Sequence, residues 1–233
     1  MCRRKIIIFD MDGLLLNSEA PIRDAWLSEC QRRGYSLDER IYSNVVGRNN
    51  QDTREFFRTH FGNDFPFDEI CFQVQSILEQ RVGRTGYKPK EGAIDLLEYL
   101  ASRSVPCVVA TSTARSEACT RLRKAKILSY ICEVTGGDEV SRGKPEPDLF
   151  LLAAKKQGAT PSECLVLEDS AFGARAARAA GMDVLVVPDL KDPPLDVREF
   201  SLGIFPCLRE VRAIIERWLA ITPDAASPRT LRV

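Results

Sequence analysis

The chain has 233 residues, and its 33 lysines and arginines are balanced by 33 aspartates and glutamates. A chain of this length can bury a substantial core and suits one large domain or one and a half. The zero net charge gives no reason to expect a nucleic acid or an anionic membrane as partner, and no apolar stretch approaches the length of a membrane span. Eight scattered cysteines without a Cys-x-x-Cys motif favour reduced side chains over a disulfide framework or a zinc site, so we expect a cytoplasmic protein.

Five short apolar runs predict the strands of one sheet. Helical patterns separate the last four runs, and strands that alternate with helices form a parallel sheet that is covered on both faces. We therefore expect an α/β fold with a doubly wound parallel sheet of five strands or slightly more. The runs are residues 5–9, 105–110, 131–135, 164–168 and 183–187.

The segment between the first and second runs is too long for a simple crossover and is rich in helical patterns. We expect residues 16–89 to form an α-helical cap, inserted into a core made of residues 1–15 and 90–221. Residues 222–233 contain several proline, alanine and serine residues, which predicts a flexible tail. We expect the cap to be hinged at residues 16–18 and 83–92. Glycines and Pro89 cluster in the second of these segments.

The first apolar run ends in two carboxylates, Asp10 and Asp12, followed by Gly13. Residues i and i+2 of an extended segment point to the same side, so both carboxylates can reach one small volume, and the glycine allows a sharp turn. Two like charges so placed repel each other, which favours either protonation of one or a cation between them, and oxygen ligands suit Mg²⁺. Taken alone, the pattern is equally typical of an Asp-rich turn that closes a strand.

Polar residues also stand at or beside the ends of later runs, where an open parallel sheet places its ligand site. Thr111 and Ser112 follow the second run, and Glu168 and Asp169 come at the end of the fourth. Lys144 lies between them in the sequence, in a loop stiffened by prolines. Each feature alone is more typical of a capping hydroxyl, a helix-start acid or a surface cation, so the order of all four along the chain is the informative observation.

This order resembles the haloacid dehalogenase superfamily, whose motifs are Asp-x-Asp-Gly, a strand-end Ser or Thr, a Lys and an acidic pair. The segments Phe9–Ser18, Gly143–Phe150 and Glu168–Met182 are similar to its β-phosphoglucomutase-like phosphatase branch, which carries an inserted helical cap. The resemblance implies a Rossmann-like core with the strand order 3-2-1-4-5. That order would place the first and fourth strands side by side and bring Asp10 next to Asp169.

The resemblance further implies a Mg²⁺-dependent phosphomonoester hydrolase that acts on a small phosphorylated metabolite through an aspartyl-phosphate intermediate. Asp10 would be the nucleophile, and Asp12 would first protonate the leaving alcohol and then activate the water. Thr111 and Ser112 would hold the phosphoryl oxygens, while Lys144 would neutralise their charge. To act as an acid at neutral pH, Asp12 would need a pKa raised above its usual value of about 3.9.

The ligands of the metal ion follow from the same resemblance. We expect Asp10, the backbone carbonyl of Asp12 and Asp169 to bind Mg²⁺, with Glu168 as a further ligand or as a neighbour that orients them. We expect a small molecule as the only partner, no nucleic acid or membrane, and a monomer or weak dimer.

In the cap, a polar loop contains Arg48 and Asn50, which could contact a sugar or a second phosphate of the substrate, although a solvated turn explains the loop equally well. A sugar-phosphate mutase is the nearest alternative, but mutases of the branch carry a histidine where this chain has Ile22. Dehalogenases of the superfamily lack the equivalent of Asp12. A phospho-acceptor signalling domain is a more distant alternative, since such domains are about half as long and place the acceptor on a middle strand.

Overall fold

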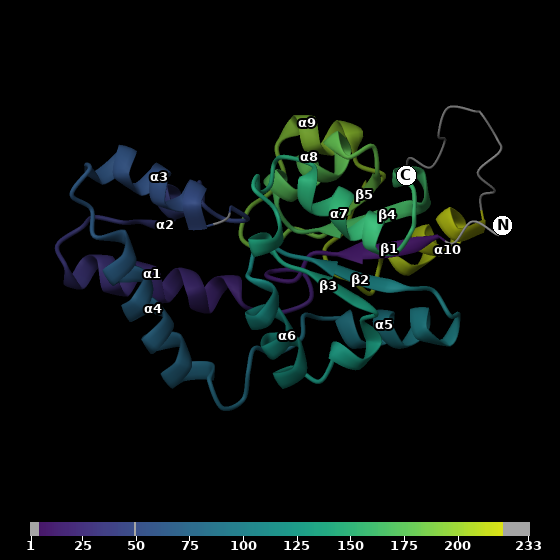
Figure 1. Ribbon diagram of the computed structural model, residues 1–233, viewed down its shortest axis with the longest axis horizontal. Helices are drawn as coiled ribbons and strands as arrows, with labels where there is room; N and C mark the ends of the chain where they lie inside the picture. The colour runs from purple at the N-terminus through teal and green to yellow at the C-terminus, as the bar shows by residue number, and fades with distance from the viewer. Residues whose placement is uncertain (1–4, 49, 221–233) are drawn as a thin grey trace.

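The structure is a computed structural model that describes residues 5–48 and 50–220. Across these residues the strands form one parallel sheet with the order β3-β2-β1-β4-β5-β6 (Figure 1). The predicted order 3-2-1-4-5 is confirmed, and a sixth strand extends the sheet beyond β5. The strands are β1 (Ile6–Phe9), β2 (Cys107–Ala110), β3 (Glu133–Thr135), β4 (Cys164–Glu168), β5 (Asp183–Val186) and β6 (Gly203–Ile204).

The central strand β1 is buried along its whole length. Ile7 and Phe9 belong to the apolar core on one face of the sheet, and Ile6 and Ile8 belong to the core on the other face. A strand that is covered on both sides needs apolar residues at every position, which is why its sequence is a continuous apolar run instead of an alternating one.

Helices form the two layers that cover the sheet. The helices α5, α6 and α10 contribute to the core on one face, and α7, α8 and α9 contribute to the core on the other, as expected for a doubly wound sheet. Their bounds are α5 (Ala93–Ser102), α6 (Arg115–Lys124), α7 (Asp148–Lys156), α8 (Ala171–Ala179), α9 (Leu195–Phe200) and α10 (Arg212–Ala220), with short 3₁₀ turns at Leu128–Tyr130, Gly137–Glu139 and Pro161–Glu163.

The register of the sheet determines which side chains meet at its edge. Phe9 of β1 lies opposite Val109 of β2 and Leu167 of β4. The residues that follow these three positions therefore arrive at the same edge of the sheet, at the carboxyl ends of the strands, where open parallel sheets bind their ligands.

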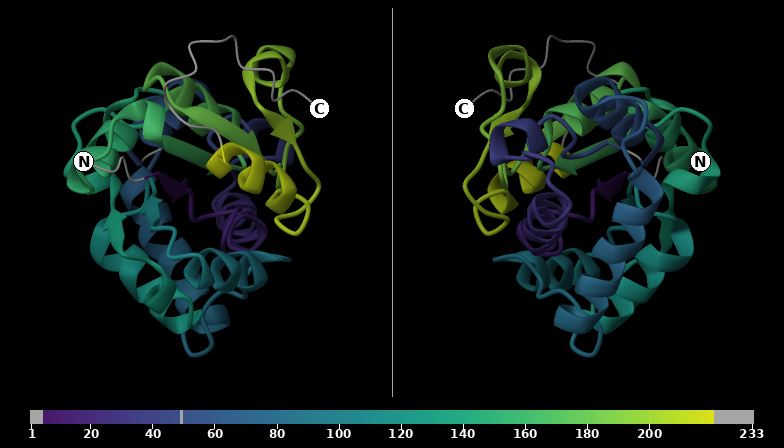
Figure 2. Two further views of the ribbon diagram at one scale, coloured as in Figure 1. Left: turned by 90° about the vertical axis from the view of Figure 1, so that its right-hand side faces the viewer. Right: turned by 90° about the vertical axis from the view of Figure 1, so that its left-hand side faces the viewer.

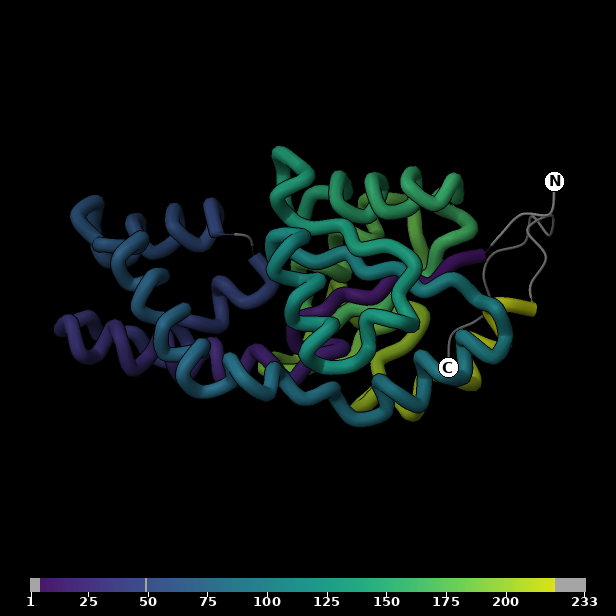
Figure 3. Tube along the Cα trace, turned by 60° about the horizontal axis from the view of Figure 1, so that its bottom comes forward, coloured from purple at the N-terminus to yellow at the C-terminus, as the bar shows by residue number. Residues whose placement is uncertain are grey.

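A helical cap lies beyond this edge, as predicted. Figure 3 shows its helices at one end of the core, and the right-hand view of Figure 2 looks onto the cap. Trp26 anchors the apolar core of the cap, with its ring centroid 5.2 Å from that of Phe57 and 5.6 Å from that of Phe67. The cap helices are α1 (Glu19–Arg32), α2 (Glu39–Tyr42), α3 (Asn50–Phe61) and α4 (Phe67–Val82).

Two linker segments join the cap to the core, and they pair with each other. Leu16 forms an antiparallel bridge with Pro89, the Asn17 amide donates to the Lys88 carbonyl at 2.8 Å, and the Lys90 amide donates to the Leu15 carbonyl at 2.9 Å. The exact domain boundaries and hinges stay predictions. The predicted tail at 222–233 lies outside the described residues. Among the helices of residues 5–48 and 50–220, none has the length and apolarity that crossing a bilayer requires.

Candidate active site

The loop after β1 places Asp10 at the edge of the sheet and turns the chain back sharply. The Asp10 amide still donates to the Leu167 carbonyl at 3.0 Å, so Asp10 continues the line of the strand. The turn is made at Gly13, whose φ is +83° and whose amide donates to the Leu16 carbonyl. A Cβ at Gly13 would lie 2.2 Å from Asp169 Oδ2, so glycine is required here both for its conformation and for its lack of a side chain.

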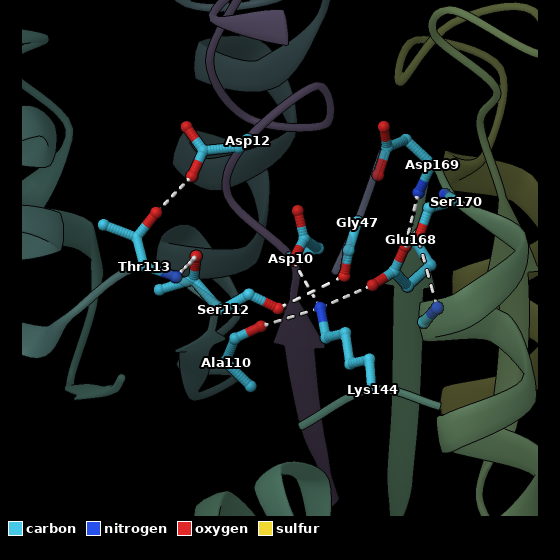
Figure 4. Close-up of polar contacts among 12 residues, drawn as sticks. Asp10, Asp12, Gly47, Ala110, Ser112, Thr113, Lys144, Glu168, Asp169 and Ser170 are labelled. Atoms are coloured by element: carbon cyan, nitrogen blue, oxygen red, sulfur yellow. Dashed lines mark hydrogen bonds and ion pairs between the residues drawn. The ribbon is translucent and has the colours of Figure 1, made fainter. Parts of the chain in front are cut away.

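Lys144 lies under the floor of the site with only 1% of its surface exposed. Its ammonium nitrogen is 2.5 Å from Asp10 Oδ1, 2.6 Å from Glu168 Oε1 and 3.3 Å from the Ala110 carbonyl oxygen (Figure 4). Burial alone would lower the pKa of Lys144, but the two carboxylates outweigh it and raise the pKa above its usual value. The lysine is therefore a permanent positive charge that three strands hold at one point.

Three carboxylates meet at this edge of the sheet. Asp10, Glu168 and Asp169 each offer an oxygen, and these oxygens lie within 4.8 Å of one another. Burial, together with the charges of Glu168 and Asp12, raises the pKa of Asp10 to about 8 although Lys144 opposes the shift. Burial and the neighbouring acids also raise the pKa of Asp169 well above its usual value. Crowded buried carboxylates with raised pKa values bind a divalent cation well, since the cation removes the repulsion that the protons otherwise relieve.

Glu168 is oriented almost entirely by the protein. Its Oε2 accepts hydrogen bonds from the Asp169 amide, the Ser170 amide and the Ser170 hydroxyl at 2.9 to 3.0 Å, and its Oε1 accepts from Lys144. A Cβ at Gly173 would lie 1.7 Å from Glu168 Oε1, so helix α8 makes room for the carboxylate at this position. Of the two predicted roles for Glu168, these contacts favour that of a neighbour that orients the ligands.

Asp12 has surroundings of the opposite kind. Its Oδ1 accepts from the Ser18 hydroxyl and the Arg121 guanidinium, both at 2.7 Å, and its Oδ2 accepts from the Thr113 hydroxyl at 2.7 Å (Figure 4 shows the Thr113 contact). Burial would raise the pKa of Asp12, but Arg121 and these hydrogen bonds outweigh burial and lower it. In this arrangement Asp12 is a carboxylate, the form that a base requires. The raised pKa that we expected for its acid step is not present here.

The remaining predicted residues line one cavity of about 780 Å³ between the cap and the core. Its wall includes Thr111, Ser112, Arg48 and Asn50 together with the two aspartates of the first motif. The Thr111 hydroxyl oxygen accepts from the Thr113 amide at 3.1 Å, which leaves its proton for a ligand. Lys144 and Glu168 are not part of the wall and lie beneath it.

The cap loop reaches the core at this cavity. The Ser112 hydroxyl donates to the Gly47 carbonyl at 3.3 Å, and the Arg48 guanidinium lies 4.6 Å from the ring centroid of Phe172 on α8. The structure thus brings the predicted cap residues Arg48 and Asn50 to the same cavity as Asp10, although their role in substrate binding stays a prediction.

Sequence reasoning missed several residues that shape the site. Glu19 is buried at the start of α1, and burial together with nearby acids raises its pKa to about 8. The contacts that Ser18, Thr113 and Arg121 make with Asp12 were also not expected. Ser18 and Glu19 directly follow the first motif, which was a usable signal, whereas Arg121 lies in the middle of a charged helix and carried none.

A comparison with known families shows where this fold and site belong. The family model of haloacid dehalogenase-like hydrolases matches residues 7–187. The chain belongs to this family. The match begins within β1 and ends just after β5, so it includes every residue of the candidate site.

Individual relatives agree with this assignment. A probable pseudouridine-5'-phosphatase of Drosophila melanogaster is 34% identical over 78% of this chain and 80% of its own length. The bifunctional riboflavin kinase/FMN phosphatase of Arabidopsis thaliana is 29% identical over 79% of this chain, which spans 48% of that longer protein. Among solved structures, a putative β-phosphoglucomutase from Thermotoga maritima has a TM-score of 0.70 and 25% identity over 91% of this chain and 99% of its own. The predicted resemblance is therefore confirmed.

Proposed function

We propose that this chain is a Mg²⁺-dependent phosphatase that hydrolyses the phosphomonoester of a small metabolite through an aspartyl phosphate on Asp10. The observation that supports it most is the arrangement of Asp10, with Lys144 2.5 Å away and two further carboxylates beside it. Curated relatives that align over most of this chain are named as phosphatases of sugar phosphates and other small metabolites. We also propose a cytoplasmic protein that is a monomer or weak dimer.

The residues present fit a divalent ion. Asp10 and Asp169 would hold it with the backbone carbonyl of Asp12, and Glu168 would orient this set through its bonds to Lys144 and to the backbone of Asp169. When bound, Mg²⁺ supplies positive charge that lets an anionic phosphate approach an anionic nucleophile.

The side chains of the chain account for the two halves of the reaction. Asp10 attacks phosphorus and forms the acyl phosphate, while the Thr111 hydroxyl holds the transferring oxygens and Lys144 neutralises negative charge from beneath the site. Asp12 gives a proton to the leaving alcohol and then takes one from the water that cleaves the intermediate. Because Asp12 is ionised in this arrangement, it is prepared for the second step, and substrate binding has to deliver its proton for the first.

Hydrolysis is favoured over phosphoryl transfer between two positions of a sugar. Ile22 lines the cavity at the position where mutases of this branch carry a histidine, and an aliphatic side chain cannot transfer a proton to or from a sugar hydroxyl. Solved relatives include structures described as β-phosphoglucomutases, but the named phosphatases among the curated relatives support hydrolysis more strongly.

The nucleophile can be tested by trapping. Brief incubation with a phosphate-labelled aryl phosphate and Mg²⁺, followed by acid quenching and peptide mapping, should place the label on Asp10. The variant Asp10→Asn should neither hydrolyse the substrate nor retain the label, because an amide is not a competent nucleophile. Asp64→Asn, a change at an exposed cap residue, is the matched control and should behave as the parent enzyme. Label on another residue, or turnover by Asp10→Asn, would remove this proposal.

A further inference from the structure

Arg121 on helix α6 contacts Asp12 from outside all four motifs. We propose that Arg121 is a positioning residue that fixes the Asp12 carboxylate toward the leaving group and ties it to the second linker between cap and core. The inference rests on the proposed function, because it assumes that Asp12 transfers protons to and from the substrate.

The contact between the two side chains is close and shielded. Arg121 Nη1 is 2.7 Å from Asp12 Oδ1, with 16% of the Arg121 side chain and 13% of the Asp12 side chain exposed. The Ser18 and Thr113 hydroxyls bind the same carboxylate from other directions. Three donors on two oxygens define one orientation of the carboxylate, and its exposed remainder faces the cavity that both residues line.

Arg121 is itself held in place, which a positioning residue requires. Its Nη2 and Nε donate to Glu117 Oε1 at 2.5 and 3.1 Å, and its guanidinium lies 5.3 Å from the ring centroid of Tyr87. Tyr87 belongs to the second linker, two residues before the Pro89 that pairs with the first linker. One helical turn further along α6, the Lys124 ammonium donates to the Gly83 carbonyl at the end of the last cap helix, at 2.5 Å.

These contacts connect the proton-transfer group to the cap. Asp12 is bound by Arg121, Arg121 stacks on Tyr87, and Tyr87 lies on a segment through which any movement of the cap must pass. A displacement of that linker therefore changes the support of Asp12 without touching Asp10 or Lys144. Small errors in the placement of a reacting group strongly reduce its effect on rate. Loss of this support should therefore slow most the substrates whose leaving group needs a proton from Asp12.

The choice of leaving group isolates that step. An alkyl phosphate such as glycerol phosphate departs as a poor leaving group and needs the proton from Asp12, whereas p-nitrophenolate departs without help. The measured quantity is the ratio of kcat/KM for glycerol phosphate to kcat/KM for p-nitrophenyl phosphate. The ratio does not depend on the fraction of folded enzyme, so a partly unstable variant still gives a valid result.

We expect Arg121→Met to lower this ratio by about tenfold, and Arg121→Lys to recover part of the loss. Asp12→Asn should lower the ratio further, and adding Arg121→Met to it should change the ratio by less than about twofold, because both act on one group. Arg123→Met, an exposed position on the same helix, should leave the ratio unchanged. For the link to the cap, Tyr87→Leu should lower the ratio and Tyr87→Phe, which keeps the ring, should not.

The outcomes separate this inference from the proposed function. An unchanged or increased ratio in Arg121→Met, with a lowered ratio in Asp12→Asn, overturns the inference alone. Independent effects of the two changes in the double variant overturn it as well, since they place Arg121 outside the function of Asp12. An unchanged ratio in Asp12→Asn instead removes the proton-transfer role of Asp12, and the inference is lost together with that part of the proposed function.

Discussion

Asp10 and Asp12 are two residues apart in the sequence, yet their surroundings are opposite. Asp10 lies among acids and one buried lysine, and burial is the main reason that its pKa is raised to about 8. Asp12 is surrounded by one guanidinium and two hydroxyls, which lower its pKa despite its burial. In the proposed mechanism these two identical residues act as nucleophile and proton carrier, and different elements of the fold supply the neighbours that distinguish them.

The largest expected effect on this comparison comes from removing the cation beside Asp10. Lys144→Met would leave two buried carboxylates without their partner, so we expect a loss of roughly 3–5 kcal/mol in the free energy of unfolding. Turnover should fall by about 10³-fold or more for aryl and alkyl phosphates alike, because the charge acts on the transferring group. Denaturant unfolding and steady-state kinetics measure both.

Lys156→Met is the matched control for this change. Lys156 also binds two carboxylates, Glu133 and Glu139, but it does so with 24% of its side chain exposed. Partly exposed ion pairs contribute at most about 1 kcal/mol, so this variant should unfold near the parent and keep its activity. Equal losses of unfolding free energy and turnover in the two variants would show that the burial of Lys144 does not make it more important than Lys156.

The support of Glu168 offers the next largest effect. Gly173→Ala places a methyl group 1.7 Å from the present position of Glu168 Oε1, so the carboxylate has to leave the position in which it binds Lys144. We expect a loss of about 1–3 kcal/mol in unfolding free energy and a weaker apparent affinity for Mg²⁺. Thermal unfolding and a Mg²⁺ titration of activity test the two effects.

A second glycine variant serves as a control, because it strains the backbone without displacing the Glu168 carboxylate. Gly158 has a φ of +65°, and apart from Gly158 and its two chain neighbours no atom of the described residues lies within 4 Å of the position that an added Cβ would take, so Gly158→Ala penalises the backbone alone. This variant should lose about 1 kcal/mol without any change in Mg²⁺ dependence. If both glycine variants bind Mg²⁺ as the parent does, Glu168 does not orient the metal ligands.

The sequence predicted the Asp10 half of the comparison well and the Asp12 half poorly. Strand ends of a parallel sheet meet at one edge, and the strand order implied by the family resemblance placed Asp10 beside Asp169, while the role of Lys144 came from the same resemblance. The partners of Asp12 depend instead on how α6 is rotated and on which rotamers reach the loop, which no local pattern encodes. For this reason Arg121 was missed, and the expected upward shift in the pKa of Asp12 was not found in this arrangement.

The same reasoning explains the outcome for the fold. Five strands were predicted because each lies in a mainly apolar run, whereas β6 is a two-residue strand that contains a glycine and shows no such run. Predicted runs also began before the observed strands at β2 and β3, where Pro106 and Cys132 precede the first paired residue. Both residues still take part in backbone hydrogen bonds between strands, since the Ile7 amide donates to the Pro106 carbonyl at 3.0 Å and the Cys132 amide donates to the Cys107 carbonyl at 2.9 Å, so the apolar runs include residues that flank the paired ladder.

The pH dependence of Mg²⁺ stabilisation tests the Asp10 side without mutation. The usual pKa of Asp10 is 3.8, and its folded, metal-free pKa is about 8. Between these values the folded protein holds a proton that the unfolded chain has released, so the stability of the metal-free protein should fall as the pH rises through this window. A cation takes the place of that proton, so Mg²⁺ should raise the Tm more at about pH 8 than at about pH 6.

Calorimetric or fluorescence melting with Mg²⁺ and with a chelator measures this difference at each pH. In Asp10→Asn the group no longer titrates, so the excess gain at the higher pH should shrink. A gain in Tm that is the same at both pH values would show that no crowded carboxylate gives up a proton to the metal ion.

The smallest expected effects concern the hydroxyls that bind Asp12. Thr113→Val removes one hydrogen bond from an uncharged donor at 2.7 Å while Ser18 and Arg121 still hold the carboxylate, so the orientation should loosen without being lost. We expect the alkyl-to-aryl ratio of kcat/KM to fall by about two- to fivefold, with aryl phosphate turnover nearly unchanged. Thr113→Ser keeps the hydroxyl and should restore the ratio.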